Sequence, residues 1–507
     1  MILPMSQPNT LLELIQAAPG DRTAIILPDA GIRVSYQQLR DQVIEMANAL
    51  ASLGITRTDR VATYLPNGLP AIVSFLAASV AGVSAPLNPN YREDEVSFYL
   101  EDTNAKILLL PPDGAEAARK AAEGRGVAVH ILEMDANGYV RIAGAPMDKI
   151  SSLPTGDDLA LVLHTSGSTG RPKRVPILHR NIAASTHNIV ATYNLSPDDV
   201  SLCVMPLFHV HGLVASTLAT LLSGGAVAVP NKFNALSFWR TVKDTGATWY
   251  SAVPTIHNLL LSRAGNEKVA AAEGLRFIRS CSASLPAEMM EQMERIFGVP
   301  VLEAYGMSEA SHQMSSNPLP PAERKPGSVG AGTGVKIAIM DEAGNLLPTG
   351  TRGEVVIQGP NVVSGYENNP EANAKSYTNG WFRTGDQGFL DEDNYLTLTG
   401  RIKELINRGG EKIGPREIDE VLLAHPAVAE AVCFGVPHPR WGEEVEAVVV
   451  LKEGAEANEA SVLAFCKERL ADFKTPKKIY ITTSIPRTAT GKIQRGAVAK
   501  AMTGASA

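Results

Sequence analysis

The stretch Thr165-Ser-Gly-Ser-Thr-Gly-Arg-Pro-Lys-Arg-Val175 consists almost entirely of small hydroxyl residues, glycines and cations. In such a loop, glycines let the backbone approach an anion closely, hydroxyl and N–H groups donate to phosphate oxygens, and Lys173 supplies a positive charge. The apolar run 159–163 directly before it predicts a buried strand. A flexible Ser/Gly linker seldom lies between two ordered segments, so we expect a polyphosphate-binding loop that leaves the edge of a sheet.

This loop differs from the common P-loop. The spacing G-x-x-x-x-G-K-[ST] fails because Gly170 is followed by Arg-Pro-Lys, and Pro172 prevents the loop from running straight into a helix. The predicted phosphate-binding residues are Thr165, Ser166, Gly167, Ser168, Thr169, Gly170 and Lys173.

Length and composition indicate a globular enzyme with more than one domain. A chain of 507 residues exceeds what one hydrophobic core usually serves. The net charge of -7 provides no basic surface, so neither nucleic acid nor an anionic membrane is an expected partner. The cysteines form no C-x-x-C pair, which argues against a zinc site or a disulfide framework and favours a reducing, cytoplasmic setting. The longest apolar stretch, 70–83, is too short to span a bilayer and predicts a core helix, and the first residues lack a secretory signal.

The first part of the chain alternates between helical and strand patterns. We expect helices over 39–53 and 69–81 and a strand over 60–65, an alternation that is typical of βαβ units and parallel sheets. From about residue 327 the pattern changes to short strands with Gly, Pro and Asn turns, which predicts a smaller β-rich subdomain.

A charged, glycine-bearing segment, 400–415, then leads into a compact pattern of helices and strands of a size normal for a domain. The predicted fold class is therefore α/β, with an N-terminal domain over 1–400, a hinge at 401–403 and a small α+β C-terminal domain over 404–507.

Two further motifs contain groups suited to a nucleotide. In Tyr305-Gly-Met-Ser-Glu-Ala, the aromatic ring could stack on a purine and Glu309 could hold Mg²⁺, although a polar turn of this kind is common. In Trp381-Phe-Arg-Thr-Gly-Asp386, the carboxylate could accept from two ribose hydroxyls; an isolated Asp would more often cap a turn. The expected pairing of Asp386 with Arg401 across the hairpin 388–400 favours the nucleotide role.

Lysine and histidine residues supply the remaining candidates. Lys492 lies in a Thr-Gly-Lys turn near the C-terminal end, where a mobile domain could insert it into an active site, although most lysines are merely solvated. His209 and His211 form an H-x-H pair, but no cysteine or carboxylate lies at ligand spacing, which argues against zinc. The segment 279–284 adds hydroxyl groups after another predicted strand, and buried structural hydroxyls are the simpler interpretation there.

Together and in this order, these motifs resemble the adenylate-forming superfamily of acyl-CoA synthetases, luciferases and peptide-synthetase adenylation domains. The resemblance covers nearly the whole chain. Arg174 departs from it, since the family usually has Gly there, and would either crowd the loop or add a phosphate contact; Ser308 replaces the commoner Thr. Within the superfamily, the segments 206–212, 279–285, 309–318 and 404–413 are most similar to oxalate-CoA ligases of the plant and yeast type.

The resemblance implies a role for each matching residue. It implies catalytic roles for Lys492, Glu309 and His209, a Mg²⁺ site at Thr165 and Glu309, a pivot at Lys403, and an acid site at His209, Ser282, His312 and Lys492. It implies a CoA site at Arg408, Gly409, Gly410 and Lys412. For ATP and AMP, beyond the phosphate loop, it implies Ser282, Ala283, Ser284, Glu303, Ala304, Tyr305, Gly306, Met307, Ser308, Asp386 and Arg401.

The reaction implied by the resemblance has two steps. A substrate carboxylate attacks the α-phosphate of ATP, giving an acyl-adenylate and pyrophosphate, and CoA then displaces AMP after the C-terminal domain has turned. No general base is needed, because a carboxylate is already ionised at neutral pH. Histidine and serine donors suit a second carboxylate and therefore oxalate. The alternatives are a CoA ligase for malonate or for a medium-chain or aryl acid, and an enzyme that loads a carrier protein; a monomer or homodimer is expected.

Overall fold

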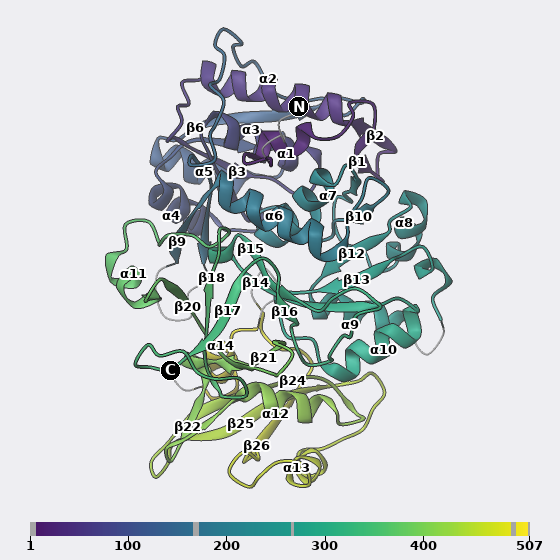
Figure 1. Ribbon diagram of the computed structural model, residues 1–507, viewed down its shortest axis with the longest axis vertical. Coiled ribbons are helices and arrows are strands. Elements are labelled where there is room, and N and C mark those ends of the chain that lie inside the picture. The colour runs from purple at the N-terminus through teal and green to yellow at the C-terminus, as the bar shows by residue number, and fades with distance from the viewer. Residues whose placement is uncertain (1–6, 166–171, 265–267, 488–492, 505–507) are drawn as a thin grey trace.

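The computed structural model describes residues 7–165, 172–264, 268–487 and 493–504. It confirms the α/β class, with two large sheets that are mostly parallel, a β-rich sheet, and a smaller sheet near the C-terminal end (Figure 1). In Figure 1 the early elements lie at the top, and β22, β25 and β26 lie at the bottom.

The largest sheet has nine strands in the order β16-β15-β14-β13-β12-β10-β11-β1-β2. Neighbours from β14 to β1 in this order are parallel, and the antiparallel strands lie at the two ends. The carboxyl ends of β10, β12, β13 and β14 therefore meet at one edge, which is where open α/β sheets bind ligands. The strands are β1 Thr23–Leu27, β2 Ile32–Ser35, β10 Val200–Leu202, β11 Ala226–Ala228, β12 Trp249–Ala252, β13 Phe277–Ser280, β14 Val301–Met307, β15 His312–Ser316 and β16 Ala331–Gly332.

The second sheet has seven strands in the order β7-β6-β5-β3-β4-β8-β9. Its edge is the antiparallel hairpin β8–β9, which flanks the predicted phosphate loop. The apolar runs at 60–65 and 159–163 form strands, as predicted. The strands are β3 Arg60–Tyr64, β4 Val83–Leu87, β5 Ala105–Leu110, β6 Ala128–Met134, β7 Val140–Ile142, β8 Leu159–Thr165 and β9 Lys173–Leu178.

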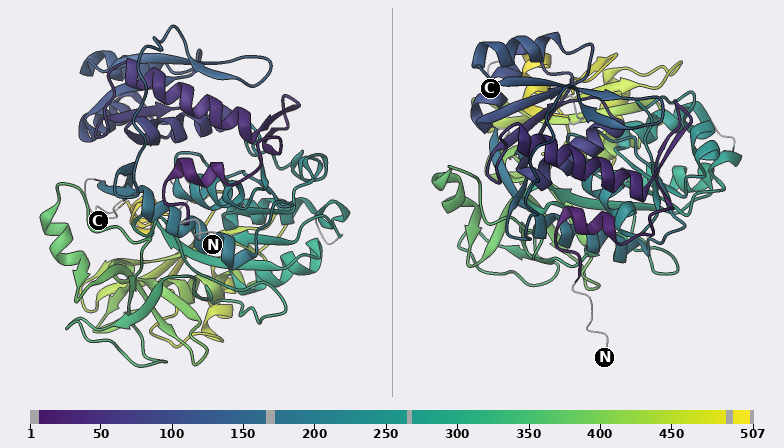
Figure 2. Two further views of the ribbon diagram at one scale, coloured as in Figure 1. Left: turned by 45° about the horizontal axis from the view of Figure 1, so that its top comes forward. Right: turned by 90° about the horizontal axis from the view of Figure 1, so that it is seen from above.

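Helices fill the space between the two large sheets. Apolar residues of α1 (Leu11–Gln16), α3 (Leu69–Ala81) and α6 (His179–Tyr193) share one core with strands of both sheets. In the left view of Figure 2, the purple and blue elements of the first part of the chain form a layer above the teal elements of the nine-stranded sheet. Residues of α3 are buried on every side, as expected of a helix that is apolar all round.

One predicted helix differs from the structure in its bounds. The helix predicted over 39–53 is α2, Tyr36–Ser52, and begins earlier because Ser35 caps it: Ser35 Oγ accepts from the Gln38 N–H, and the Gln38 side chain accepts from the Ser35 N–H. The segment after β10 begins as a π-helix, His211–Leu218, before α7, Ala219–Leu222. Such wide turns are frequent at functional sites.

The other helices cover the outer faces or connect strands. They are α4 Glu93–Thr103, α5 Glu116–Arg125, α8 Phe238–Thr245, α9 Pro254–Ala264, α10 Ala287–Phe297, α11 Pro370–Ser376, α12 Pro415–Leu423, α13 Glu459–Lys467 and α14 Arg495–Thr503, with 3-10 turns at Ala270–Ala272, Ser308–Ala310 and Ile402–Glu404.

The β-rich sheet is antiparallel throughout, in the order β17-β18-β20-β19 with β21 paired to β20. It begins close to the predicted position. The strands are β17 Lys336–Met340, β18 Gly353–Gln358, β19 Tyr377–Thr378, β20 Trp381–Leu390 and β21 Leu396–Arg401.

The C-terminal sheet has an apolar cluster on each face. Along β24, Ala431 and Cys433 join the cluster that contains residues of α12 and α13, whereas Val432 and Phe434 join the cluster with Val498 of α14. This alternation follows from the two-residue period of a strand. The sheet order is β23-β22-β25-β24, with β26 parallel to β25, and the strands are β22 Ile406–Arg408, β23 Glu411–Ile413, β24 Val428–His438, β25 Gly442–Leu451 and β26 Lys478–Thr482.

Candidate functional site

The carboxyl edge of the nine-stranded sheet carries most of the predicted site residues. After β10 the chain runs to His209 and the π-helix, after β13 it turns through Ser282, and β14 ends at Tyr305–Met307, followed by Glu309. Ala283 and Ser284 are exposed in the turn after Ser282. Strand order thus brings together groups that are far apart in the sequence.

The phosphate hairpin lies beside this edge. Thr165 and Lys173 are paired across β8 and β9, so they flank the predicted loop. The predicted residues Ser166, Gly167, Ser168, Thr169 and Gly170 lie outside the described residues.

Tyr366 connects Lys173 with Glu309, although the sequence analysis did not select it. Lys173 Nζ lies 4.4 Å from the centre of the Tyr366 ring, and the Tyr366 hydroxyl donates to Glu309 Oε1 at 2.8 Å. Burial raises the pKa of Glu309, and the positive charges of Arg401 and Lys173 act in the opposite direction. Burial also lowers the pKa of Lys173, as does the charge of Lys403. The predicted pivot lysine is therefore within electrostatic reach of the phosphate hairpin.

The oxygen donors at Glu309 and Thr165 fit a magnesium ion. Mg²⁺ prefers oxygen ligands and usually binds through one or two carboxylates together with substrate phosphates. Within the described ranges, no group of three or more His, Cys, Asp or Glu side chains forms a metal site of its own. A metal at Glu309 would therefore depend on the phosphates of ATP for further ligands.

Asp386 and Arg401 form the pair expected from the hairpin. They lie opposite each other in β20 and β21, and Arg401 Nε lies 3.2 Å from Asp386 Oδ1. The Tyr305 hydroxyl donates to Asp386 Oδ2. The charge of Asp386 raises the pKa of Arg401, and burial raises the pKa of Tyr305. The carboxylate is thus held by two groups at the edge of the nucleotide motif.

Close backbone contact explains why the motif that begins at Tyr305 has a glycine, Gly306, at its second position. A Cβ atom at Gly306 would lie 2.1 Å from the His312 carbonyl oxygen in the neighbouring strand β15. Neighbouring Ala304 is buried, whereas Met307 and Ser308 are partly exposed.

Glu303 lies at the contact between β14 and the C-terminal helix α12. Its Oε1 atom accepts from the Leu285 N–H at 2.9 Å and lies 3.9 Å from Arg416 Nη2. In the described part of the chain, neither Glu303 Oε2 nor Arg416 Nη2 has a hydrogen-bond partner. Burial raises the pKa of Glu303 to about 7, against the opposing charge of Arg416.

Two of the predicted acid-binding residues, the partly exposed Ser282 and the buried His312, belong to a polar cluster with His211. Ser282 Oγ lies 3.0 Å from His211 Nδ1, and the rings of His211 and His312 meet edge to face with centres 5.2 Å apart. His209, which the sequence analysis preferred, lies at the start of this segment, where its Nδ1 accepts from the His211 N–H at 3.3 Å. His211 is therefore a site residue that the sequence analysis missed; its only signal was the H-x-H pattern.

Arg279 of β13 is a third residue that was not predicted, after Tyr366 and His211, and its side chain is fully buried. It donates to the Tyr193 hydroxyl at 2.8 Å, to Ser251 Oγ at 2.9 Å and to Gln313 Oε1 at 2.9 Å. The available signal was a charged residue directly after the apolar pair Phe277 and Ile278.

Backbone conformation also distinguishes two residues that are predicted to bind the acid, Ser282 and His312. Eight described residues other than glycine have positive φ, and five of them are asparagines, which tolerate this region well. The others are Ser282 at 71°, Ser311 at 52° and His312 at 118°. Such conformations persist where the surrounding structure enforces them, often at ligand sites.

The predicted CoA residues lie on the hairpin β22–β23, which Figure 1 shows in the lower part of the molecule, apart from β14 and β15. Arg408 makes two contacts with the Glu444 carboxylate, at 2.6 and 3.1 Å, and lies over the Trp441 ring. Gly409 and Gly410 have positive φ at the turn, and Lys412 is exposed. Lys403 follows Arg401 in a 3-10 turn, and Lys492 lies outside the described residues.

Arg174, the departure from the family pattern, pairs with carboxylates of the scaffold. Its Nε atom lies 3.3 Å from Asp102 Oδ2, and its Nη1 atom lies 3.5 Å from Glu367 Oε2. Asp102 also contacts His164 at 2.9 Å. The guanidinium of Arg174 is therefore paired with acidic side chains. This differs from both expectations from the sequence, which were crowding of the loop or a contact with phosphate.

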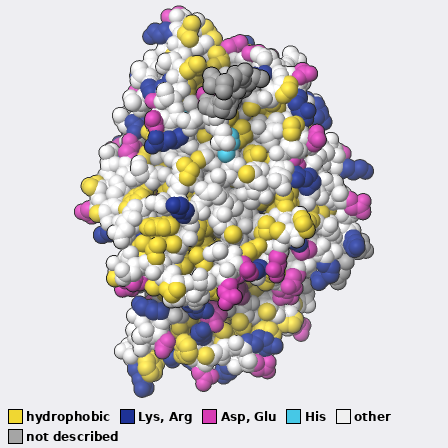
Figure 3. Space-filling model, in the orientation of Figure 1, with side chains coloured by type: hydrophobic (Ala, Val, Ile, Leu, Met, Phe, Trp, Pro, Cys, Tyr) yellow, Lys and Arg dark blue, Asp and Glu magenta, His cyan; other side chains and the backbone are white. Residues whose placement is uncertain are grey.

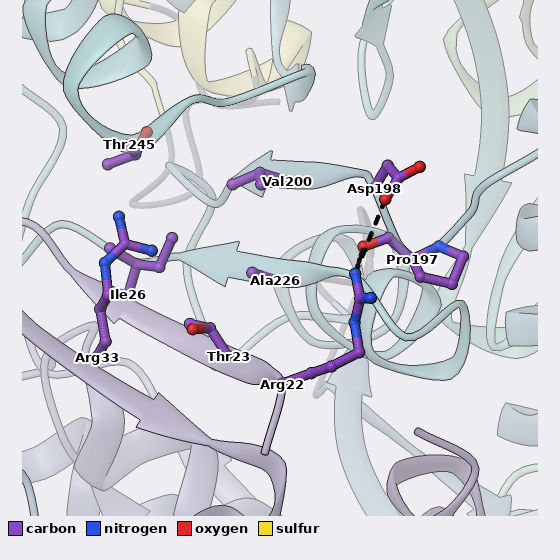
Figure 4. A pocket seen from close by; sticks show the side chains of 9 residues that line it. All are labelled: Arg22, Thr23, Ile26, Arg33, Pro197, Asp198, Val200, Ala226 and Thr245. Carbon is purple, nitrogen blue, oxygen red and sulfur yellow. Dashed lines mark hydrogen bonds and ion pairs between the residues drawn. The ribbon is translucent and has the colours of Figure 1, made fainter. Parts of the chain in front are cut away.

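A surface depression lies at the other edge of the nine-stranded sheet, away from the predicted site residues (Figure 4). It is lined by Thr23, Val200 and Ala226, the first residues of β1, β10 and β11, and so lies at the amino edge. Arg22 closes one side through contacts with the Pro197 carbonyl and Asp198. Ligands of such sheets bind at the opposite edge, so this depression is not the candidate site.

The surface shows no large field of one charge on the face seen in Figure 3, where Lys and Arg side chains are scattered among Asp and Glu. All four cysteines are buried free thiols. No helix in the described ranges has both the length and the apolar character required to cross a bilayer.

Comparison with known proteins agrees with this geometry. Residues 13–367 match the family of AMP-binding enzymes, and residues 417–492 match the AMP-binding enzyme C-terminal domain. The chain is 48% identical to a probable CoA ligase of Humulus lupulus, covering 97% of this chain and 95% of the relative. It is 46% identical to an oxalate–CoA ligase of Arabidopsis thaliana, covering 97% of each. The crystal structure of ATP-bound MatB from Rhodopseudomonas palustris superimposes with a TM-score of 0.90 at 33% identity, covering 97% of this chain and 98% of that one.

Proposed function

Because this chain belongs to the family of AMP-binding enzymes, we propose that it is an ATP-dependent acid–CoA ligase that converts oxalate to oxalyl-CoA, releasing AMP and pyrophosphate. The observation that carries the choice of acid is the hydrogen-bonded cluster of Ser282, His211 and His312 at the carboxyl edge of the sheet. A pocket for a fatty or aryl acid would be lined mainly by apolar groups, whereas Ser282 and His312 donate hydrogen bonds to a second carboxylate in this proposal. The relatedness to an oxalate–CoA ligase over nearly the whole chain supports the same acid.

In the first step, the residues align two anions. The phosphate hairpin with Lys173 holds the ATP phosphates, Asp386 accepts from the ribose hydroxyls, and Glu309 with Thr165 holds Mg²⁺, which neutralises phosphate charge when bound. One carboxylate of the acid attacks the α-phosphorus, and pyrophosphate leaves. Lys492 lies between the reacting anions in this proposal. Catalysis then consists of alignment and charge stabilisation, since the nucleophile is already ionised.

In the second step, the C-terminal domain turns about Lys403 and brings the hairpin with Arg408 to the adenylate. The CoA thiol attacks the acyl carbon, and AMP leaves. Figure 1 shows this hairpin apart from β14, which supports a rotation between the two steps. A cytoplasmic location and a monomeric or homodimeric state remain predictions from the sequence.

The test is CoA-dependent AMP release from ATP with oxalate, malonate, acetate, hexanoate and 4-coumarate in parallel. We expect a strong preference for oxalate that is lost in His312→Ala. Turnover of malonate, hexanoate or 4-coumarate with oxalate inert would overturn the oxalate assignment and leave the ligase chemistry. Adenylate formation without any CoA-dependent release would instead favour transfer to a carrier protein.

A further inference from the structure

The buried guanidinium of Arg279 has an unusual set of neighbours. Its described hydrogen-bond partners include no carboxylate: they are Tyr193, Ser251 and Gln313, together with ring nitrogens of His211 and His312 at 3.5 Å. Arginine keeps its charge at every physiological pH, and burying a cation without an anion is costly. By contrast, the more exposed Arg401 and Arg276 each have a carboxylate partner, Asp386 and Asp199 respectively. The acid side of the site thus holds a positive charge that these partners do not neutralise.

The hydrogen bonds that Arg279 donates determine which atom donates in the neighbouring Ser251–His211 and His211–Ser282 hydrogen bonds. Arginine nitrogens only donate, so Ser251 Oγ accepts from Arg279 at 2.9 Å. His211 Nε2 lies 2.6 Å from Ser251 Oγ and 3.5 Å from Arg279 Nη1. Because Arg279 Nη1 can only donate, His211 Nε2 is an acceptor, and the Ser251 hydroxyl, which accepts from Arg279, donates its own proton to His211 Nε2.

This assignment determines the rest of the chain of hydrogen bonds. With Nε2 as an acceptor, neutral His211 carries its proton on Nδ1 and donates it to Ser282 Oγ at 3.0 Å. The Ser282 hydroxyl then directs its own proton elsewhere. His312 Nδ1 lies 3.5 Å from Arg279 Nη2, so by the same rule it is the acceptor and the proton of His312 is on Nε2.

We propose that Arg279 is a positioning and specificity-determining residue, which turns Ser282 O–H and His312 Nε2–H toward the second carboxylate of the acid and supplies the positive charge for a dianion. This inference rests on the proposed function. It predicts a preference for small dicarboxylates over acids of the same shape with one negative charge. The positive φ of Ser282 and His312 agrees with a site in which both side chains are held for binding.

Oxamate provides the matched ligand, because it replaces one carboxylate of oxalate with an uncharged amide of similar size. The experiment compares the KM for oxalate with the inhibition constant for oxamate, and repeats both by calorimetric binding in the presence of a non-hydrolysable ATP analogue. In Arg279→Gln, we expect affinity for oxalate to fall about 10- to 100-fold while that for oxamate changes less than about threefold. Arg279→Lys should recover part of the preference because it keeps the charge.

Two variants separate a specific role from a structural one. Arg276→Gln removes an arginine directly before the same strand, β13, where it pairs with Asp199 at 2.6 Å away from the site, and it should leave the ratio of oxalate affinity to oxamate affinity unchanged. Ser251→Ala keeps Arg279 but removes the hydroxyl that connects it to His211. This variant should lower the ratio of oxalate affinity to oxamate affinity, and it provides the test even if Arg279→Gln fails to fold.

The outcomes distinguish this inference from the proposed function. Equal losses for oxalate and oxamate in Arg279→Gln and Ser251→Ala would overturn the role of Arg279 while leaving an oxalate ligase. A wild type that binds oxamate as tightly as oxalate would also overturn it. A wild type that turns over hexanoate and not oxalate would overturn both.

Discussion

The nucleotide side and the acid side of the site manage charge in different ways. On the nucleotide side, charges of opposite sign occur together: Arg401 contacts Asp386, and Lys173 and Glu309 meet at Tyr366. On the acid side, the buried charge of Arg279 has neutral partners. The contribution of the nucleotide side to the reaction should therefore be nearly the same for every acid substrate. The acid side, in contrast, is suited to a ligand that brings its own negative charge. Variants on the two sides should differ in whether their effect depends on the acid.

The largest effect is expected from Glu309→Gln, which removes a negative charge from the nucleotide side. Loss of one oriented electrostatic group costs about 100- to 1000-fold in rate. We expect ATP–pyrophosphate exchange to fall by this factor with every acid. Glu294→Gln is the control, because Glu294 pairs with Arg324 at 2.9 Å outside the site. A loss confined to oxalate would contradict the division between the two sides.

Ser282→Ala should have a smaller effect that depends on the acid. It removes the hydroxyl at the end of the chain from Arg279, and a hydrogen bond to a charged group is worth about 1.5 to 3 kcal/mol. We expect kcat/KM for oxalate to fall about tenfold or more and that for acetate to remain nearly unchanged. Steady-state AMP release measures both, and a parallel loss with acetate would place Ser282 on the nucleotide side.

Tyr366→Phe tests the link between Lys173 and Glu309. The variant keeps the ring beneath Lys173 but removes the hydroxyl that donates to Glu309 at 2.8 Å. A single hydrogen bond of this kind corresponds to about a 3- to 15-fold loss in exchange rate, again independent of the acid. An unchanged rate would show that Glu309 does not need this donor.

Glu303→Gln should change the pH dependence of stability. Burial raises the pKa of Glu303 to about 7 in the folded protein, above the value of about 4.5 expected on unfolding. The contribution of Glu303 to the free energy of unfolding is therefore fully present below about pH 4.5 and is lost as the pH rises through about 7. The loss lowers the free energy of unfolding by an amount on the order of 3 kcal/mol. We expect the urea midpoint of the wild type to fall more than that of the variant between pH 5 and pH 8. Parallel curves would contradict the raised pKa.

The smallest effect on catalysis is expected from Arg174→Gly. The guanidinium contacts Asp102 and Glu367, so its loss should change the KM for ATP by less than about twofold and lower the stability by about 1 kcal/mol. ATP titration and urea unfolding give the two values. A tenfold increase in KM would assign Arg174 to the phosphates.

Local patterns predicted several features well. The pairing of Asp386 with Arg401 was expected because both lie on one hairpin, where short-range geometry fixes the register. The buried helix α3 and the strand before the phosphate loop follow from runs of apolar residues. The early start of α2 was missed because the cap at Ser35 was not recognised.

The sequence by itself determined the class of chemistry, since a predicted phosphate loop, an acidic residue after a strand, an aspartate predicted to bind ribose and a late lysine form an ordered set of motifs. Only the tertiary structure decided which histidine faces Ser282 and what surrounds Arg279. The order of β10, β12 and β13 in the sheet brings His211, Ser251 and Arg279 together, and no local pattern encodes that order. The motifs are read from residues close in sequence, whereas the choice of acid depends on hydrogen bonds between strands that only packing brings side by side.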